Sequence, residues 1–240
     1  MVLKKTSKTK EMDKDNMPKH IAFICDGNRR WAKSKGLPTL LGHREGMQAV
    51  KRVTKRIAEL GIPNVSFFCF STENFNRSEE EVSYLFDLFK NLSSIVPDLV
   101  KCGYKFKHTG DRSLLDAETL KIIDEVTEKT KHLTKGTVNI ALAYGGRNDI
   151  VNAAKKIVSS GVKAEDITEE SFKKYLSTDG LFDVDLLVRS SGEQRISGFM
   201  LYNMPYAELL FVKKHWPSFK AKDVDACVLE YQNRNRRYGK

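Results

Sequence analysis

Short runs of apolar residues recur along the chain, and glycine, asparagine or serine bounds each of them. Phe, Ile and Val, which favour extended backbone, are frequent in these runs. The runs predict about six strands, over residues 21–25, 65–70, 104–109, 138–144, 184–188 and 209–212.

Between these runs the apolar residues follow the helical spacing of three and four positions. Residues 47–60 carry such a stripe, and Ser78 with Glu81 forms a capping box that opens a second helix, expected to continue to Leu99. Further helices are expected over residues 114–132, 149–159, 169–176 and 224–235. Alternating strands and helices predict an α/β fold, a single domain with a largely parallel, twisted sheet flanked by helices on both faces.

A single domain accounts for the whole length. The chain has 240 residues, within the range of one α/β domain, and contains no internal repeat or long linker. Residues 1–17 are lysine-rich and polar, so we expect a disordered basic leader there and a folded domain over residues 18–240. No apolar run approaches the ~18 residues that span a bilayer, and the leader is not typical of a secretory signal. With four scattered cysteines, these features predict a cytoplasmic protein.

Polar segments that contain arginine follow four of the expected strands. These segments are residues 26–31, 71–77, 144–149 and 189–197. Ligands of open parallel sheets gather at the carboxyl ends of the strands, so we expect the four segments to build one anion-binding rim. The formal net charge of +10 agrees with an anionic partner.

Gly27 and Asn28 stand where a strand turns into a helix, and backbone N–H groups in such a turn can hold a phosphate. Arg29 and Arg30 would add charge-assisted hydrogen bonds. The Asp-Gly-Asn triplet is also an ordinary turn signal. A second anionic group is suggested by arginines at other strand ends, namely Arg77, Arg189 and Arg195.

Asp26 is the carboxylate within this group of arginines, and two interpretations are open. It could cap the following helix, or it could bind magnesium together with phosphate oxygens. Glu208 is a candidate second carboxylate, and His43 could donate to phosphate or cap its own helix. The chain contains no P-loop, dinucleotide fingerprint, nucleophile elbow or zinc motif. The residues therefore indicate an α/β enzyme that binds phosphorylated ligands with magnesium.

Seven segments, in order along the chain, resemble the cis-prenyltransferase family. They extend from His20 to Gly239 and read HIAFICDGNRRWAKSKG, GHREG, FCFSTENFNRS, NIALAYGGRNDI, LLVRSSGEQRISGF, PYAELLF and RRYG. That family condenses isopentenyl diphosphate with an allylic prenyl diphosphate and adds isoprene units in cis geometry. The resemblance implies a homodimeric, Mg²⁺-dependent enzyme with an apolar tunnel for the growing chain.

The resemblance also implies roles for individual residues. Asp26 would be the catalytic aspartate and a magnesium ligand, with Glu208 completing the metal environment. The allylic diphosphate would be held by Gly27, Asn28, Arg29, Arg30 and His43, with Trp31 nearby. The isopentenyl diphosphate would be held by Arg77, Arg189, Arg195 and Ser197 and, from the neighbouring subunit, by Arg237 and Gly239.

The segment after the second strand would also face the substrates. Its members are Ser71, Thr72, Glu73, Asn74 and Phe75. Asn74 matches the position usually given the proton-accepting role, and Asn28 is the alternative. An amide is a weak base, so a diphosphate oxygen or water could be the acceptor.

Three positions depart from the family pattern, and they keep alternatives open. Thr39 stands where a basic residue is common, Gln194 where histidine is frequent, and Phe75 where tryptophan is frequent. Thr39 leaves room for a short-chain member or one that joins prenyl units irregularly. A non-catalytic subunit would lack the motif residues, which are present. A nucleic-acid partner is not expected, because no basic helix or aromatic stacking surface is evident, whereas a lipid product allows peripheral contact with a membrane.

Overall fold

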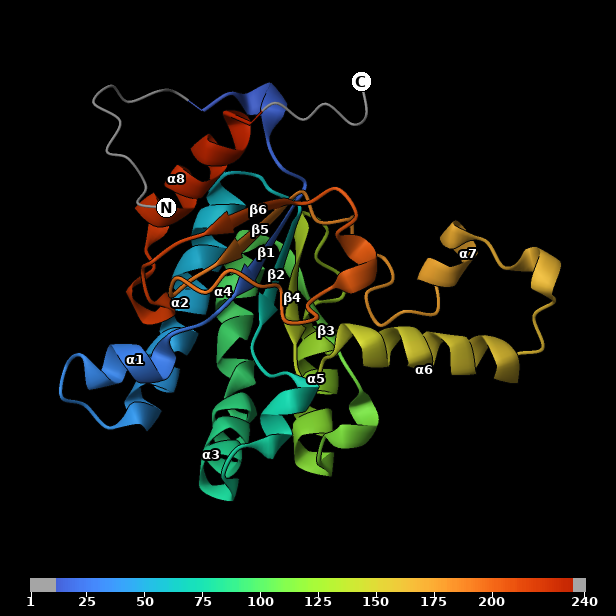
Figure 1. Cartoon of the computed structure of the whole chain (residues 1–240), viewed down its shortest axis with the longest axis horizontal. Helices are drawn as coiled ribbons and strands as arrows, with labels where there is room; N and C mark the ends of the chain where they lie inside the picture. The colour runs from blue at the N-terminus through green and yellow to red at the C-terminus, as the bar shows by residue number, and fades with distance from the viewer. Residues whose placement is uncertain (1–11, 235–240) are drawn as a thin grey trace.

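Six parallel strands form the centre of the computed structural model, which describes residues 12–234 (Figure 1). Their order across the sheet is β3-β4-β2-β1-β5-β6. The strands are β1 (His20–Ile24), β2 (Asn64–Phe68), β3 (Tyr104–Thr109), β4 (Gly136–Ala141), β5 (Leu186–Arg189) and β6 (Glu208–Phe211). Each lies within a few residues of its predicted position, and the expected parallel sheet of about six strands is confirmed.

The register of the sheet determines which chain segments lie side by side at its carboxyl edge. Ile24 at the end of β1 pairs with Phe68 at the end of β2 and with Arg189 at the end of β5. The chain segments that follow these three strands therefore leave the sheet side by side at its carboxyl edge.

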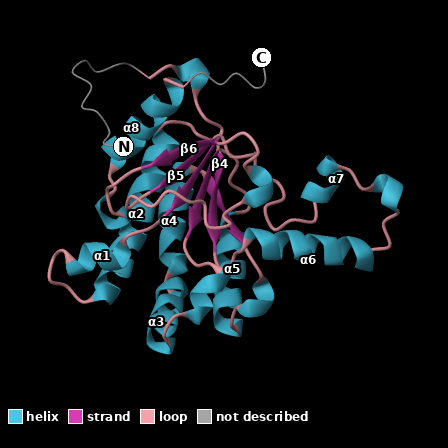
Figure 2. Ribbon diagram, in the orientation of Figure 1, coloured by secondary structure: helices cyan, strands magenta, loops and turns pink. Residues whose placement is uncertain are grey.

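Helices cover the two faces of the sheet unequally (Figure 2). They are α1 (Asn28–Lys33), α2 (Thr39–Glu59), α3 (Glu79–Lys90), α4 (Val96–Cys102), α5 (Ala117–Thr130), α6 (Gly146–Ser159), α7 (Glu169–Lys173) and α8 (Ala221–Gln232). One face is covered by α2, α4, α5 and α8, which bury a large aliphatic and aromatic core. The other face packs against a smaller cluster that includes Phe199 and Met200, next to the amino end of α6. The rest of α6 and α7 extends away from the sheet (Figure 1).

The single helix expected from Ser78 to Leu99 is wrong, because the chain breaks it after α3. A 3-10 turn at Leu92–Ile95 separates α3 from α4, and Asn91 Nδ2 donates to the Asp87 carbonyl oxygen at 3.1 Å. Pro97 in the first turn of α4 has no N–H to continue the hydrogen bonds of a helix. The apolar spacing continued through the break because the turn is itself buried in the same core.

Part of the expected leader lies against the domain. A 3-10 turn at Lys14–Asn16 precedes β1, and Met17 packs against the core. Asp13 N–H donates to Gln232 Oε1 at 3.1 Å, and Gln232 Nε2 donates to the Asp13 carbonyl oxygen at 2.6 Å. These contacts hold residues 12–17 beside α8. Between residues 12 and 234, no helix has both the length and the apolar character to cross a membrane.

A buried row of polar side chains crosses the sheet at its amino end. His20 Nδ1 lies 2.7 Å from the Phe182 carbonyl oxygen, and His20 Nε2 lies 2.7 Å from Ser66 Oγ. Asn139 Nδ2 donates to the same Ser66 Oγ at 2.9 Å. A neutral His20 that donates from Nδ1 and accepts at Nε2 satisfies both ring nitrogens, whereas Asn139 Oδ1 has no hydrogen-bond partner among the described residues. Burial lowers the pKa of His20 from 6.5 to about 4.

Acid is therefore expected to destabilise the fold through His20. Between pH 6.5 and 4 the unfolded chain binds a proton that the folded chain does not, so the free energy of unfolding falls as the pH falls. The loss should be on the order of 2–3 kcal/mol by pH 4, measured as the urea midpoint at a series of pH values. His20→Gln should flatten this pH dependence, whereas His132→Gln, at an exposed position, should not. Equal slopes in all three chains would contradict the assignment.

Candidate active site

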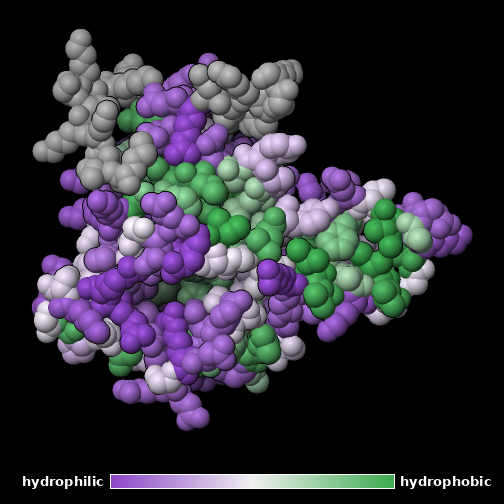
Figure 3. Space-filling view, in the orientation of Figure 1, coloured by the Kyte–Doolittle hydropathy of each residue, from purple (hydrophilic) through white to green (hydrophobic). Residues whose placement is uncertain are grey.

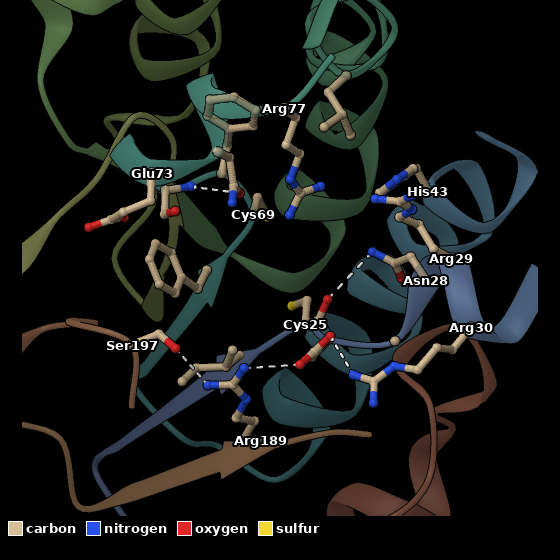
Figure 4. A pocket seen from close by; sticks show the side chains of 18 of the residues that line it. Cys25, Asn28, Arg29, Arg30, His43, Cys69, Glu73, Arg77, Arg189 and Ser197 are labelled. Atoms are coloured by element: carbon tan, nitrogen blue, oxygen red, sulfur yellow. Dashed lines mark hydrogen bonds and ion pairs between the residues drawn. The ribbon is translucent and has the colours of Figure 1, made fainter. Parts of the chain in front are cut away.

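A cavity of about 730 Å³ opens at the carboxyl edge of the sheet, where β1, β2 and β5 end (Figure 4). It brings together most of the residues expected from the sequence. These are Asp26, Gly27, Asn28, Arg29, Arg30, His43, Ser71, Glu73, Asn74, Arg77, Arg189, Arg195 and Ser197. Its lining also includes apolar side chains, such as Phe68 and Leu85, and two thiols, Cys25 and Cys69, which sequence reasoning did not single out.

Asp26 is fixed at both its main chain and its carboxylate. Its N–H donates to Ser190 Oγ at 2.9 Å, and its carbonyl oxygen accepts from the Trp216 N–H at 3.0 Å. Its carboxylate accepts from Arg189 at 3.0 Å and from Arg30 at 3.1 Å, one arginine to each oxygen (dashed lines from the labelled Arg189 and Arg30 in Figure 4). Burial alone would raise the pKa of Asp26, but Arg189 and Arg30 outweigh it and hold that pKa below its ordinary value. The cavity therefore presents a fixed anionic carboxylate between two arginines.

Gly27, rather than Asp26, occupies the cap position of α1, and no side chain caps this helix. The helix-capping interpretation of Asp26 is therefore wrong. Gly27 has φ +97°, and a Cβ there would lie 2.5 Å from Ser191 Oγ and 2.7 Å from His215 Nδ1. Backbone conformation and lack of space both require glycine at this turn, which leads directly from β1 into the basic helix α1.

The first and last residues of the GHREG segment, Gly42 and Gly46, are glycines of α2 that lie against Asn28. A Cβ on Gly42 would lie 2.1 Å from the carbonyl oxygen of Asn28, and one on Gly46 would lie 2.7 Å from Asn28 Oδ1. The backbone of α2 can therefore lie directly against the first residue of α1. Asn28 Oδ1 is buried and has no hydrogen-bond partner among the described residues. This close packing sets the position of Asn28 at the cavity wall.

Arg189 organises the segment that follows β5. Its guanidinium is buried and donates to the Arg195 carbonyl oxygen at 2.6 Å and to Ser197 Oγ at 2.8 Å (Figure 4). Glu193 then bridges two arginines, since it accepts from Arg30 at 2.9 Å and from Arg195 at 2.6 Å. Glu193 stood in a segment predicted to face the site but was not itself predicted to act there.

On the opposite wall, the carboxylate of Glu81 lies among the nitrogen atoms of two arginines and a histidine. Arg77 donates to it at 2.8 Å, and Arg29 and His43 have nitrogen atoms 3.3 Å from its oxygens. Burial lowers the pKa of His43, although the charge of Glu81 acts in the opposite direction. The sequence identified Glu81 only as part of a capping box with Ser78. The Glu81 N–H donates to Ser78 Oγ, which confirms Ser78 as the cap of α3, whereas the Glu81 side chain pairs with Arg77, Arg29 and His43.

The segment after β2 forms a 3-10 turn, Thr72–Asn76. Ser71 N–H donates to Asn74 Oδ1 at 3.1 Å, which fixes the Asn74 amide at the cavity. Phe75 faces elsewhere, with its ring 4.9 Å from that of Phe70, and lines a separate surface pocket. Thr72 lies against Gly145, outside the cavity.

Other predicted residues are also placed away from the cavity. Trp31 Nε1 donates to Ser218 Oγ at 2.9 Å. Asp26 follows the end of β1, whereas Glu208 begins β6 at the opposite edge of the sheet, where it pairs with Arg234 at 2.8 Å. The chain thus does not bring Glu208 to Asp26. Arg237 and Gly239 lie outside the described residues.

The expected rim of four strand ends is built from three. The segment after β4 lines a different cavity of about 820 Å³, together with residues of β3, α5 and α6. Thr39 begins α2, and Gln194 is exposed; neither lines the main cavity. In the part of the chain that the structure describes, no group of three or more His, Cys, Asp or Glu side chains could hold a metal ion.

Known proteins resemble the chain over nearly its full length. Residues 24–239 match the family model described as "Putative undecaprenyl diphosphate synthase". An isoprenyl transferase of Listeria innocua is 43% identical over 228 residues, which cover 93% of this chain and 90% of the relative. The ditrans,polycis-undecaprenyl-diphosphate synthase ((2E,6E)-farnesyl-diphosphate specific) of Micrococcus luteus is 39% identical over 241 residues, covering 98% and 97%.

A solved structure shares the fold. The lavandulyl diphosphate synthase of Lavandula x intermedia, in complex with dimethylallyl diphosphate, matches with a TM-score of 0.90 and 34% identity, covering 94% of this chain and all of that one. Sequence, fold and cavity agree, and the resemblance read from the motifs is confirmed. The chain belongs to the undecaprenyl diphosphate synthase family of prenyltransferases.

Proposed function

We propose that this protein is a cis-prenyl diphosphate synthase that condenses isopentenyl diphosphate with an allylic prenyl diphosphate and releases inorganic diphosphate. One observation carries the proposal: a single cavity that contains the Asp26 carboxylate is lined by arginines from three separate segments, two of which bind that carboxylate. Two diphosphate groups need such a density of cations. The resemblance to named prenyl diphosphate synthases supports the same reaction.

In the proposed reaction, the C1–O bond of the allylic diphosphate breaks and its electron pair leaves with the diphosphate. The double bond of isopentenyl diphosphate supplies the electrons for the new carbon–carbon bond to C1. A proton then leaves C2 of the isopentenyl unit. Gly27, Arg29, Arg30 and His43 would stabilise the charge on the leaving diphosphate, which is the largest catalytic contribution in such sites. Asn74 or Asn28 would orient the proton acceptor, and a diphosphate oxygen is the stronger base.

We propose that Mg²⁺ binds at Asp26. The donor set fits only in part, because Asp26 is anionic and faces the cavity while Glu208 lies at the opposite edge of the sheet. Mg²⁺ commonly takes one or two carboxylates and completes its shell with phosphate oxygens and water. Asp26 and the phosphate oxygens of the substrate would hold the ion together. The bound ion would neutralise negative charge on the leaving diphosphate. Glu208 could contribute only from a second subunit.

A homodimer is proposed on two grounds. The terminal Arg-Tyr-Gly segment resembles the family motif in which Arg237 and Gly239 contact isopentenyl diphosphate in the neighbouring subunit. The arm formed by α6 and α7 presents apolar surface (Figure 3), and its large exposed side chains include Val151, Val158 and Ile167. Burial of such a surface against a second copy would stabilise a dimer. We further propose a cytoplasmic enzyme that contacts a membrane peripherally to release its lipid product.

The product chain would extend between α2 and α3, but the space there is small. A separate cavity of about 30 Å³ lies behind the site, lined by residues that include Met47, Leu85 and Phe89. An apolar tunnel therefore needs a shift of α3. This small space favours a second candidate, a short-chain or irregularly coupling member of the same family. Chromatography of the products from labelled isopentenyl diphosphate with primers of different length distinguishes the two candidates.

Two arginine variants test the assignment of the substrate sites. Arg195→Ala should raise the KM for isopentenyl diphosphate more than that for the allylic primer, and Arg30→Ala should do the reverse. Each lost charge-assisted contact should cost roughly 1.5–3 kcal/mol, which is about 10- to 150-fold in KM. Arg147→Ala, at an exposed position of α6, is the matched control. Equal effects on both KM values would defeat the two-site assignment.

A further inference from the structure

Glu81 lies where an anionic substrate would be expected. Its side chain is only 12% exposed, and its oxygens are 2.8 Å from Arg77, 3.3 Å from Arg29 and 3.3 Å from His43. All three partners line the main cavity. The proposed function gives Arg29 and His43 to the allylic diphosphate, and the family resemblance gives Arg77 to isopentenyl diphosphate.

The carboxylate satisfies this set of donors incompletely. His43 is 7% exposed, and its Nε2, although 3.3 Å from Glu81, has no hydrogen-bond partner of acceptable geometry among the described residues. Arg29 likewise makes an ion pair with Glu81 at 3.3 Å while its side chain remains half exposed. A carboxylate has two oxygens, whereas a diphosphate offers more oxygens and more charge. The donors therefore suit a larger anion better than they suit Glu81.

We propose that Glu81 is an internal counter-ion, which occupies the anion position between Arg29, His43 and Arg77 in the empty enzyme and is displaced by the diphosphate of a substrate. The proposal rests on the proposed function, because it takes these three residues as diphosphate ligands. Glu81 then limits affinity: the substrate binds only the fraction of molecules in which the carboxylate has left, and the apparent dissociation constant rises accordingly.

Neutralising Glu81 should therefore tighten anion binding, opposite to the effect of removing a ligand. The probe is inorganic pyrophosphate, titrated calorimetrically in a buffer that contains EDTA so that no divalent ion takes part. Glu81→Gln should bind it roughly tenfold more tightly than the wild type. The cap of α3 is the bond from the backbone N–H of residue 81 to Ser78 Oγ, which the substitution keeps, so α3 should keep its start.

Glu80→Gln is the matched control. Glu80 precedes Glu81 in the same helical turn, is exposed, and does not line the cavity. This variant removes the same charge from the start of α3, and its affinity should equal that of the wild type. Thermal melts of both variants check that each is folded.

The possible outcomes separate the two proposals. Unchanged or weaker binding by Glu81→Gln, or an equal gain in Glu80→Gln, would overturn the counter-ion proposal while leaving the diphosphate site in place. Failure of both the wild type and Glu81→Gln to bind pyrophosphate would instead count against the proposed function, and with it against the role of Glu81. Binding of pyrophosphate by Glu81→Gln but not by the wild type would support both the counter-ion proposal and the proposed function.

Discussion

Replacing Asp26 by alanine is expected to lower kcat at least about a hundredfold. The carboxylate is the anionic group that Arg30 and Arg189 hold in the cavity, and the proposed metal ion depends on it. The measurement is turnover of labelled isopentenyl diphosphate at saturating magnesium and both substrates. Residual activity above about a tenth of wild type would show that Asp26 is not the catalytic carboxylate.

A second variant separates chemistry from stability. Alanine at position 26 leaves Arg189 buried without its carboxylate partner, and removal of one partner of a buried ion pair is costly. Asp26→Asn keeps the size of the side chain and an oxygen that accepts a hydrogen bond. It should melt close to the wild type and still lose activity. An active Asp26→Asn chain would mean that the charge of Asp26 is not needed.

Gly42→Ala is expected to lower the free energy of unfolding by about 3 kcal/mol and to raise the KM for the allylic substrate. Within an ordinary helix this substitution is stabilising by about 1 kcal/mol. Here the new methyl group would lie 2.1 Å from the carbonyl oxygen of Asn28, so α2 would have to move away from α1. Urea unfolding and initial rates measure the two effects.

The control for Gly42→Ala is Gln48→Ala, on an exposed position of the same helix. It changes helix propensity without touching α1 and should be nearly neutral. A Gly42→Ala chain as stable as the wild type would show that the contact between α2 and Asn28 adjusts easily.

The sheet could be predicted because its four central strands, β1, β2, β4 and β5, are buried and mostly apolar runs, and the partly exposed β3 and β6 still carry a core of apolar residues. The helices between the strands followed from the period of their apolar residues in the same way. Periodicity failed between α3 and α4, where Leu92 and Ile95 keep the apolar spacing although they lie in a 3-10 turn. A buried turn and a buried helix present the same pattern of apolar positions. Pro97 was the available signal of a break.

Site residues could be predicted where their position at the end of a strand was enough to place them in the cavity. Residues that follow β1, β2 and β5 meet because those strands end level with one another. Glu208 is the first residue of its strand, so its placement at the amino end of the sheet, away from Asp26, could have been read from the sequence. Tertiary packing alone decides that Trp31 faces Ser218 and that Phe75 faces Phe70. Glu81 and Glu193 each have one partner nearby in the sequence, Arg77 and Arg195. They were missed because their remaining partners, Arg29 and His43 for Glu81 and Arg30 for Glu193, come from other segments of the chain.

The ion pair between Asp26 and Arg189 has a consequence for how the enzyme is made. Its two partners are 163 positions apart in the sequence. At a synthesis rate of about 5–20 residues per second, Asp26 leaves the ribosome about 8–33 seconds before Arg189. During that interval β1 and the Gly27 turn exist without β5, which lies between β1 and β6 in the sheet. The Asp26 carboxylate thus gains its buried partner and its place in the cavity only when most of the chain has been synthesised.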